Sequence, residues 1–191
     1  RFWQALPPKG TLGIFFGAWH SQPIVDRVMG RISDAMLDQR VAEILRFEQM
    51  LADEGTVLLK FWFHLTRDQQ KKRLETLAKS PRTRWRVTDL DWKYFKRYER
   101  FVSVAGRYCR RTSTGGAPWI VVSGADPHYR NLTVGRTILA ALNERLGVKR
   151  ARHSPDATSP LRPSVDRVNL LRALDLGQTL SAERYQKQLE K

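Results

Sequence analysis

Residues 56–65 read Thr-Val-Leu-Leu-Lys-Phe-Trp-Phe-His-Leu, a mostly apolar run rich in β-branched and aromatic side chains. A run of this kind, without alternation of polar residues, is typical of a central strand of a parallel sheet that is buried on both faces. Thr66 follows directly and Gln69 stands three residues later, which is the spacing of a capping box at the start of a helix. The segment therefore predicts a buried strand followed at once by a helix.

The segments on either side continue this alternation. Short apolar runs predict two more buried strands, at 12–16 and 119–123. The helical spacing of apolar residues predicts helices that include 24–28, 37–51 and 133–146. Alternating strands and helices indicate an α/β fold with a parallel sheet, in which ligands bind at the carboxyl ends of the strands. These ends are expected near 17–21, 64–67 and 124–130.

The distribution of charge points to the kind of partner. The 191 residues contain 34 Lys and Arg against 19 Asp and Glu, a net charge of +15. From Arg67 to Arg111 fifteen cations stand against five acids, so this segment carries +10 of that charge. A local excess of positive charge predicts a polyanionic partner: a nucleic acid, polyphosphate or the phosphates of a nucleotide. An acidic membrane surface is less favoured, because the rest of the chain has the pattern of a globular core.

One group of cations lies in a loop that Pro81 interrupts. It holds four cations and no acid within eight residues: Lys79, Arg82, Arg84 and Arg86. Arg presents a fork of donors and Lys a point charge, and both suit phosphate oxygens. A solvated loop without a ligand is the alternative, and phosphate binding is favoured over it.

A second group forms a stripe on the helix that Thr88 and Asp91 are expected to cap. The stripe comprises Lys93, Arg97, Arg100, Arg107 and Arg111. Glu99 is the only acid between the first and the last of them, so ion pairs within the helix are scarce. A phosphate-binding face and an ordinary exposed face of a helix are equally supported for this stripe.

Other kinds of site are disfavoured. The single cysteine, Cys109, excludes a disulfide framework and lies on the apolar side of its predicted helix, as a core residue would. His20 and His64 lack the spacing of metal ligands, so we expect structural or pocket-lining roles and no metal site. The chain has neither an apolar run of membrane-spanning length nor a signal peptide, and the expected compartment is the cytoplasm.

Several short motifs, in this order along residues 1–146, resemble the polyphosphate kinase 2 family. They are Arg-Phe-Trp-Gln-Ala-Leu-Pro-Pro-Lys-Gly at 1–10, Gly-Ile-Phe-Phe-Gly-Ala-Trp-His at 13–20, Lys-Phe-Trp-Phe-His-Leu at 60–65, Asp-Trp-Lys at 91–93, Arg-Thr-Ser-Thr at 111–114 with Ala-Pro-Trp at 117–119, and Gly-Ala-Asp at 124–126 with Tyr-Arg at 129–130. Each motif alone is weak, and together they are specific. Residues 169–178 resemble the segment that joins the two kinase-like domains of the two-domain polyphosphate:AMP phosphotransferases within this family.

This resemblance implies a P-loop-kinase-like fold with a mobile basic lid, here about 79–111, and phosphoryl transfer between polyphosphate and a nucleotide with Mg²⁺. Such chemistry depends on positioning and on neutralising charge. Polyphosphate is then expected on the cations of the lid: Lys79, Arg82, Arg84, Arg86, Lys93, Arg97 and Arg100. A nucleotide or phosphate is expected near Arg111, Thr112, Ser113 and Asp126. For these four residues, helix capping and turn formation are the alternatives.

The sequence departs from the family pattern in two places. The family's Gly-rich phosphate loop, Gly-x-Asp-x-x-Gly-Lys, is absent, and the chain has no Gly-x-x-x-x-Gly-Lys-[Ser/Thr]. Active members carry Asp and Arg, which help to place metal and hold phosphate, where this chain has Phe16 and Gly17. We therefore expect a catalytically degenerate domain that contributes architecture or a polyphosphate track, without catalytic residues of its own, and a fragment that begins inside a domain.

The expected organisation is a polyphosphate kinase 2-like domain over 1–146 and, over 147–191, a linker with a short helix around Leu170–Leu176 that leads to a second kinase-like domain. In the parent protein the expected reaction converts AMP to ADP, and a homo-oligomer is expected. Two alternatives stay open. A basic nucleic-acid-binding module is supported by charge and by Trp85 but has no recognisable reader motif. A purely structural half that binds neither polyanion is the other.

Overall fold

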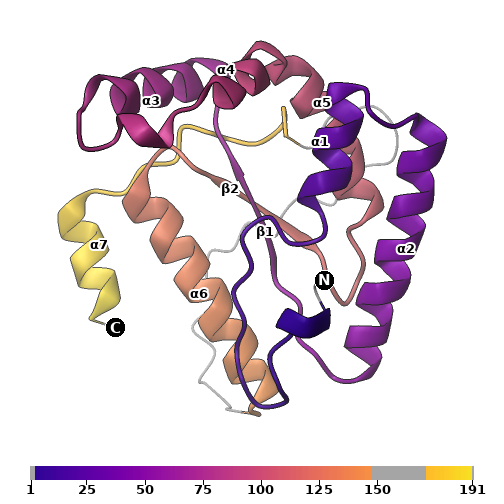
Figure 1. Ribbon diagram of the computed structural model, residues 1–191. Helices are drawn as coiled ribbons and strands as arrows, with labels where there is room; N and C mark the ends of the chain where they lie inside the picture. Colours follow the sequence, from indigo (N-terminus) through magenta and orange to yellow (C-terminus); the bar gives the residue numbers. More distant parts are fainter. Residues whose placement is uncertain (1–2, 148–170, 191) are drawn as a thin grey trace.

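The computed structural model describes residues 3–147 and 171–190, and within them two parallel strands lie at the centre of the molecule (Figure 1). Strand β1 spans Lys60–His64 and pairs with β2, Trp119–Ser123, with Lys60 opposite Trp119 and His64 opposite Ser123. The amide of Gly124 donates to the carbonyl of His64 at 2.8 Å and extends the ladder by one step. The predicted α/β class with a parallel sheet is confirmed, and both strands end at the same edge.

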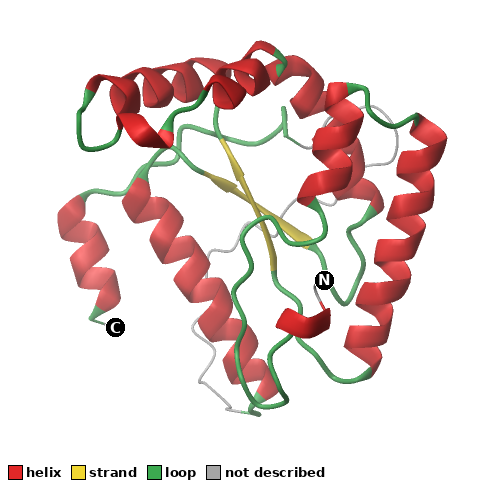
Figure 2. Cartoon of the chain, viewed as in Figure 1, coloured by secondary structure: helices red, strands yellow, loops and turns green. Residues whose placement is uncertain are grey.

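Helices surround the two strands (Figure 2). In the orientation of Figure 1, α1 (Ser21–Met29) and α2 (Asp34–Asp53) lie to the right of the strands, and α5 (Tyr98–Arg111) packs on α1. To the left lie α6 (Pro127–Arg145), which contacts β2, and α7 (Ala182–Leu189), which contacts α6. A short 3₁₀ turn, η1 (Trp3–Ala5), precedes them.

The carboxyl end of β1 leads into α3 (Arg67–Lys79). The segment predicted as a lid, about 79–111, runs from the last residue of α3 through the 3₁₀ turn η2 (Arg84–Arg86) and α4 (Asp89–Lys96) to the end of α5, and α3, η2 and α4 lie above the strands in Figure 1. The capping box of α3 is present as predicted: the Gln69 amide donates to the Thr66 hydroxyl at 3.1 Å, and the Thr66 amide donates to the Gln69 side chain at 2.9 Å. The helix expected to run from Asp91 to Arg111 is broken in two at Arg97, whose φ of −105° and ψ of 19° leave the helical range.

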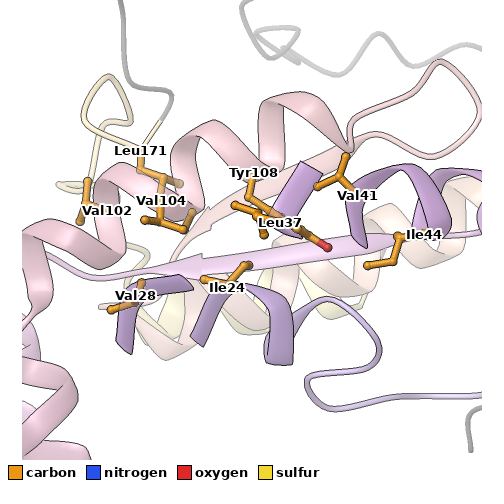
Figure 3. Packing of buried hydrophobic residues seen from close by; sticks show 10 residues of the cluster. Ile24, Val28, Leu37, Val41, Ile44, Val102, Val104, Tyr108 and Leu171 are labelled. Atoms are coloured by element: carbon orange, nitrogen blue, oxygen red, sulfur yellow. The ribbon is translucent and has the colours of Figure 1, made fainter. Parts of the chain in front are cut away.

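The hydrophobic core fills the space between the strands and the helices α1, α2 and α5. Figure 3 shows its members from these three helices together with Leu171, which lies on a turn. The buried residues are Ile24, Val28, Leu37, Val41, Ile44, Val102, Val104, Ala105, Tyr108 and Leu171. Their spacing on each helix follows the 3.6-residue period that predicted it, so the helices of this layer form where the sequence indicates.

Two predictions about strands are wrong. Residues 12–16 form a loop, with Ile14 72% exposed and Phe16 98% exposed. A strand needs a neighbour to satisfy its amides and carbonyls, and within the described residues β1 and β2 pair only with each other. The 56–65 segment is also not buried on both faces, because Phe63 of β1 is 50% exposed.

The residues after the undescribed stretch 148–170 belong to the same body as the domain. Leu171 is 1% exposed in the core, and Arg172 forms an ion pair with Glu99 at 2.9 Å. Leu171–Leu176 form turns, so the helix predicted there is wrong over these residues, and the helix found is α7 further on; Leu170 lies outside the described residues. The expected linker thus supplies a core residue of the domain.

Candidate functional site

A carboxylate, an ammonium group and an imidazole meet inside the molecule. Glu48 of α2 accepts from Lys60 of β1 at 2.7 Å and from Nε2 of His20 at 2.7 Å, and the indole of Trp19 donates to it at 3.2 Å. The side chains of Glu48 and Lys60 are only 2% and 6% exposed. A buried charge has to be paired and hydrogen-bonded, and each of these is.

The same cluster reaches the end of α5 and the start of β2. Lys60 also donates to the carbonyl of Thr112 at 2.6 Å, and His20 Nδ1 lies 3.0 Å from the Tyr108 hydroxyl. The Thr112 hydroxyl donates to the Tyr108 carbonyl at 2.9 Å and accepts from the indole of Trp119 at 2.8 Å. We call His20, Glu48, Lys60, Tyr108 and Thr112 the buried network. Together with Trp119, its hydrogen bonds connect five segments: α2, β1, α5, β2 and the loop that precedes α1.

Burial and pairing shift the ionisation of this region. Burial lowers the pKa of His20 against the opposing effect of Glu48, so the imidazole is neutral at pH 7. Burial alone would raise the pKa of Glu48, but the hydrogen bonds from His20 and Lys60 outweigh it and lower the pKa. Burial raises the pKa of the Cys109 thiol to about 12, which makes this residue unreactive and supports its predicted place in the core.

The buried network was not predicted, although two residues of the sequence indicate it. Glu48 occupies an apolar position of the α2 pattern, and Lys60 interrupts the apolar run of β1. Two opposite charges at predicted core positions indicate a buried ion pair, since an isolated buried charge is very costly. His20, for which a structural or pocket-lining role was expected, contacts Glu48, which is 28 residues away in the sequence.

The cations of the predicted lid lie on the surface. Lys79, Arg82, Arg84, Arg86, Lys93 and Arg97 are all exposed, and no ion pair involves any of them within the described residues. Trp85 stands among them, 75% exposed, with its indole donating to the Arg82 carbonyl at 2.9 Å. We call the six Lys and Arg residues, without Trp85, the lid cations. Among the described residues no carboxylate neutralises their charge, so their side chains are available to bind an anion.

The rest of the predicted stripe is engaged with neighbouring helices. Arg107 donates to Asp34 at 2.9 Å, Arg111 donates to Asp38, and Arg100 donates to the carbonyl of Arg27 at 3.2 Å. A hydrogen bond from Arg27, with help from Arg107, lowers the pKa of Asp34 to about 2. The acids that the sequence of α5 lacks are supplied by α2, so Arg107 and Arg111 form ion pairs between helices.

The predicted nucleotide or phosphate residues do not form one open site. Thr112 is fully buried, and its hydroxyl donates to the Tyr108 carbonyl. The carboxylate of Asp126 accepts from the Tyr129 amide at 2.7 Å and caps α6, which therefore starts six residues before the predicted Thr133. Ser113 is exposed, and its hydroxyl accepts from the Trp119 amide at 3.1 Å.

Residues suited to a divalent cation are not gathered here. Mg²⁺ takes carboxylate oxygens and substrate phosphates as ligands, and within 3–147 and 171–190 no group of three His, Cys, Asp or Glu comes together. The part of the chain that the structure covers also has no helix long and apolar enough to cross a bilayer.

Proteins that resemble this chain in sequence are polyphosphate phosphotransferases. The profile of the family described as polyphosphate kinase 2 matches residues 1–150. The chain is 52% identical to a polyphosphate:AMP phosphotransferase of Pseudomonas aeruginosa and 45% identical to one of Pseudomonas syringae pv. tomato, covering 99% of this chain and 38% of each relative. An AMP/ADP-polyphosphate phosphotransferase of Meiothermus ruber is 34% identical over 74% of this chain and 53% of its own length.

Solved structures give the same result. A polyphosphate kinase 2 structure from Pseudomonas aeruginosa superposes with a TM-score of 0.65 at 46% identity, covering 99% of this chain and 34% of that one. One from Arthrobacter aurescens superposes with a TM-score of 0.62 at 29% identity, covering 69% and 46%. The chain thus spans about two fifths of the length of the first two relatives, 38% of each. With the family profile matched over most of its length, the chain belongs to the polyphosphate kinase 2 family.

Proposed function

We propose that this chain is one domain of a polyphosphate:AMP phosphotransferase, and that it binds the polyphosphate chain without catalysing the transfer itself. The observation that carries the proposal is the set of lid cations, which are exposed and have no acidic partner among the described residues. Both Pseudomonas relatives are named polyphosphate:AMP phosphotransferases, which supplies the reaction: AMP and polyphosphate give ADP in the parent protein.

The chemistry of the lid cations suits a linear polyanion. Lys79 is the last residue of α3, and three more lie on the turn that follows it: Arg82, Arg84 and Arg86. The other two, Lys93 and Arg97, lie on and just after α4. An array of cations along consecutive turns attracts a chain of phosphates at several points, and each contact displaces counterions. Attraction to phosphate is not selective by itself, so nucleic acid is the competitor that an experiment has to exclude.

Absence of catalysis is supported by two residues of the loop that precedes α1. Phe16 is almost fully exposed and Gly17 has a φ of +76°, at the two positions where active family members carry Asp and Arg. The nearby Glu48 and Lys60 are enclosed and hold the fold together. Mg²⁺ and the catalytic groups would then belong to a second kinase-like domain of the same polypeptide, and AMP or ADP would react there. The parent protein would also form a homo-oligomer.

Calorimetric titration at near-physiological salt tests the binding. Long-chain polyphosphate and single-stranded DNA are compared at equal phosphate concentration, with the unmodified chain and with the triple variant Arg82→Gln/Arg84→Gln/Arg86→Gln. We expect a preference for polyphosphate and a loss of at least about tenfold in affinity in the variant, equivalent to ~1.4 kcal/mol. Equal binding of both polyanions would favour the nucleic-acid module, and no binding would favour a purely structural half.

Turnover is tested separately with AMP, polyphosphate and Mg²⁺. We expect no ADP above a control without protein. Formation of ADP that disappears on Arg84→Gln would show that the chain is catalytic and would refute that part of the proposal.

A further inference from the structure

The segment 12–16 has the side-chain pattern of a strand but lies in the loop between η1 and α1 (Figure 2). Its alternate side chains face inward: the ring of Phe15 lies 6.3 Å from that of Trp19, and a Cβ added to Gly13 would contact Pro7 at 3.0 Å. The side chains between them are apolar and exposed: Leu12 at 59%, Ile14 at 72% and Phe16 at 98%. This alternation is that of a β-strand with one covered face.

The backbone of the segment has no neighbour to pair with. No amide or carbonyl of 12–16 has a backbone hydrogen-bond partner within residues 3–147 and 171–190. Gly10 and Gly17 on either side have φ values of +84° and +76°, and no residue between them has a positive φ. Negative φ values are compatible with the β conformation. An exposed apolar segment with unpaired backbone groups is a site at which another chain can add a strand.

The surroundings of the segment indicate which chain adds the strand. No Asp, Glu, Lys or Arg occurs from residue 10 to residue 25, although 28% of the chain is charged. Because the net charge is +15, two copies repel each other over most of their surface, and they meet most readily where no charge is present. An acidic partner would be drawn to the cations elsewhere on the surface. An uncharged apolar segment on a strongly basic chain therefore favours a second copy of this chain.

Two copies of 12–16 complement each other about a two-fold axis. In an antiparallel pair centred on Ile14, this residue lies opposite its own equivalent, and Leu12 of each copy lies opposite Phe16 of the other. Residues directly opposite each other share one face of the pair, so the exposed apolar rows of both copies pack side by side. Each copy supplies the neighbouring strand that the other lacks, and a two-fold contact closes at two copies.

We propose that 12–16 is the interface of a dimer of this chain, in which the segments of two copies pair antiparallel and become strands. The proposal rests on the proposed function for the homo-oligomer, to which it assigns an interface. It does not depend on polyphosphate binding, since none of the lid cations takes part.

Sedimentation equilibrium of the 191-residue chain over a range of concentrations measures the dissociation constant of the dimer. Ile14→Lys places a charge at the centre of the pairing, at a position that is exposed in the single chain. Leu146→Lys is the matched control, because Leu146 at the end of α6 is 74% exposed and receives the same charge. Hydrogen exchange, read by mass spectrometry on peptides that cover 12–16, detects pairing of the backbone. Far-UV circular dichroism verifies that each variant is folded.

We expect a dimer whose dissociation constant rises at least about tenfold in Ile14→Lys and less than about threefold in Leu146→Lys. Hydrogen exchange in 12–16 should slow as the concentration of the unmodified chain rises, and it should not slow in Ile14→Lys. Equal weakening by both substitutions, or a dimer without slower exchange in 12–16, would overturn the proposal. Association that continues beyond two copies would overturn it as well.

A calorimetric titration with long-chain polyphosphate separates this proposal from the proposed function. If the chain is monomeric at every concentration but binds polyphosphate, the dimer interface is refuted and polyphosphate binding stands. If it is monomeric and does not bind polyphosphate, both are refuted. If it forms the expected dimer without binding polyphosphate, the interface stands and the proposed binding function is refuted.

Discussion

Charged residues of this protein occur in two contrasting settings. In the buried network, Glu48 and Lys60 are almost fully enclosed, and each makes short hydrogen bonds within the chain. The lid cations are exposed and have no acidic partner among the described residues. The first group holds five segments of the chain together, while the second adds positive charge that the described part of the fold does not use.

The position of a charge, and not its sign or number, decides whether it is neutralised within the fold or left available to a ligand. Arg107 and Arg111 belong to the same predicted stripe as the lid cations Lys93 and Arg97, yet their charge is neutralised by Asp34 and Asp38 of α2. A polyanion has to compete with these carboxylates for the two arginines, whereas at the lid it competes only with water and salt.

The largest expected effect comes from breaking the buried pair. Glu48→Leu leaves Lys60 buried without its carboxylate, and we expect the free energy of unfolding to fall by about 3–5 kcal/mol. Urea denaturation measures it. Glu43→Leu, on the exposed face of the same helix, is the matched control and should change stability by less than ~0.5 kcal/mol. The double variant Glu48→Leu/Lys60→Met should regain part of the lost free energy of unfolding. If Glu48→Leu and Glu43→Leu lose the same stability, the buried pair contributes no more than an exposed charge, which contradicts the prediction.

A second prediction separates the two halves of the basic stripe. Lys93→Gln/Arg97→Gln removes two lid cations, and we expect polyphosphate affinity to fall about tenfold, or ~1.4 kcal/mol. Arg107→Gln/Arg111→Gln removes the same charge from ion-paired positions and should change affinity by less than about threefold. Calorimetry at one salt concentration compares the two directly. Equal losses in both variants would mean that polyphosphate responds to total charge and not to the unpaired cations.

A third prediction concerns pH and the buried histidines. Burial lowers the pKa of His20 and of His64 in the folded state below the ordinary value of 6.5. The unfolded chain then binds protons at a higher pH than the folded one, so the stability contribution is complete above pH 6.5 and declines as pH falls below it. We expect a lower urea midpoint at pH 5.5 than at pH 7.5. His20→Asn/His64→Gln should flatten this dependence, and a midpoint that is the same at both pH values in the unmodified chain would contradict the prediction.

The smallest effect on polyphosphate affinity is expected from removing a carboxylate that neutralises arginines. Asp34→Asn releases Arg27 and Arg107 from their shared carboxylate, which gives the surface of α5 a free cation. We expect a gain in polyphosphate affinity of less than about threefold, since one contact is added at an exposed position. The low pKa of Asp34, about 2, keeps this ion pair intact at any pH above the acid range, so titration at pH 7 is sufficient. A decrease in affinity would show that Arg107 acts only through its place in the fold.

Much of the fold follows from local patterns in the sequence. The strand pair, the capping box at Thr66 and Gln69, the helix over 37–51 and the core position of Cys109 were all predicted from spacing and side-chain type. The strand expected at 12–16 failed because an apolar run identifies a strand only if a neighbouring strand is there to pair with it. The prediction of one continuous helix across Arg97 was wrong for a related reason, since neither Gly nor Pro marks a break there and only packing fixes the angle between α4 and α5.

The sequence by itself determined the class of fold, the excess of positive charge in 67–111 and the family resemblance, because each depends on residue types and on spacings within one segment. Only the tertiary structure decided which charges are free. Arg107 meets Asp34 across 73 residues, Lys60 meets the carbonyl of Thr112 across 52, and the core includes Leu171 from beyond the predicted domain boundary. The physical reason is that the cost of a charge depends on its solvent exposure and on its partners, and both are set by segments far apart in the chain.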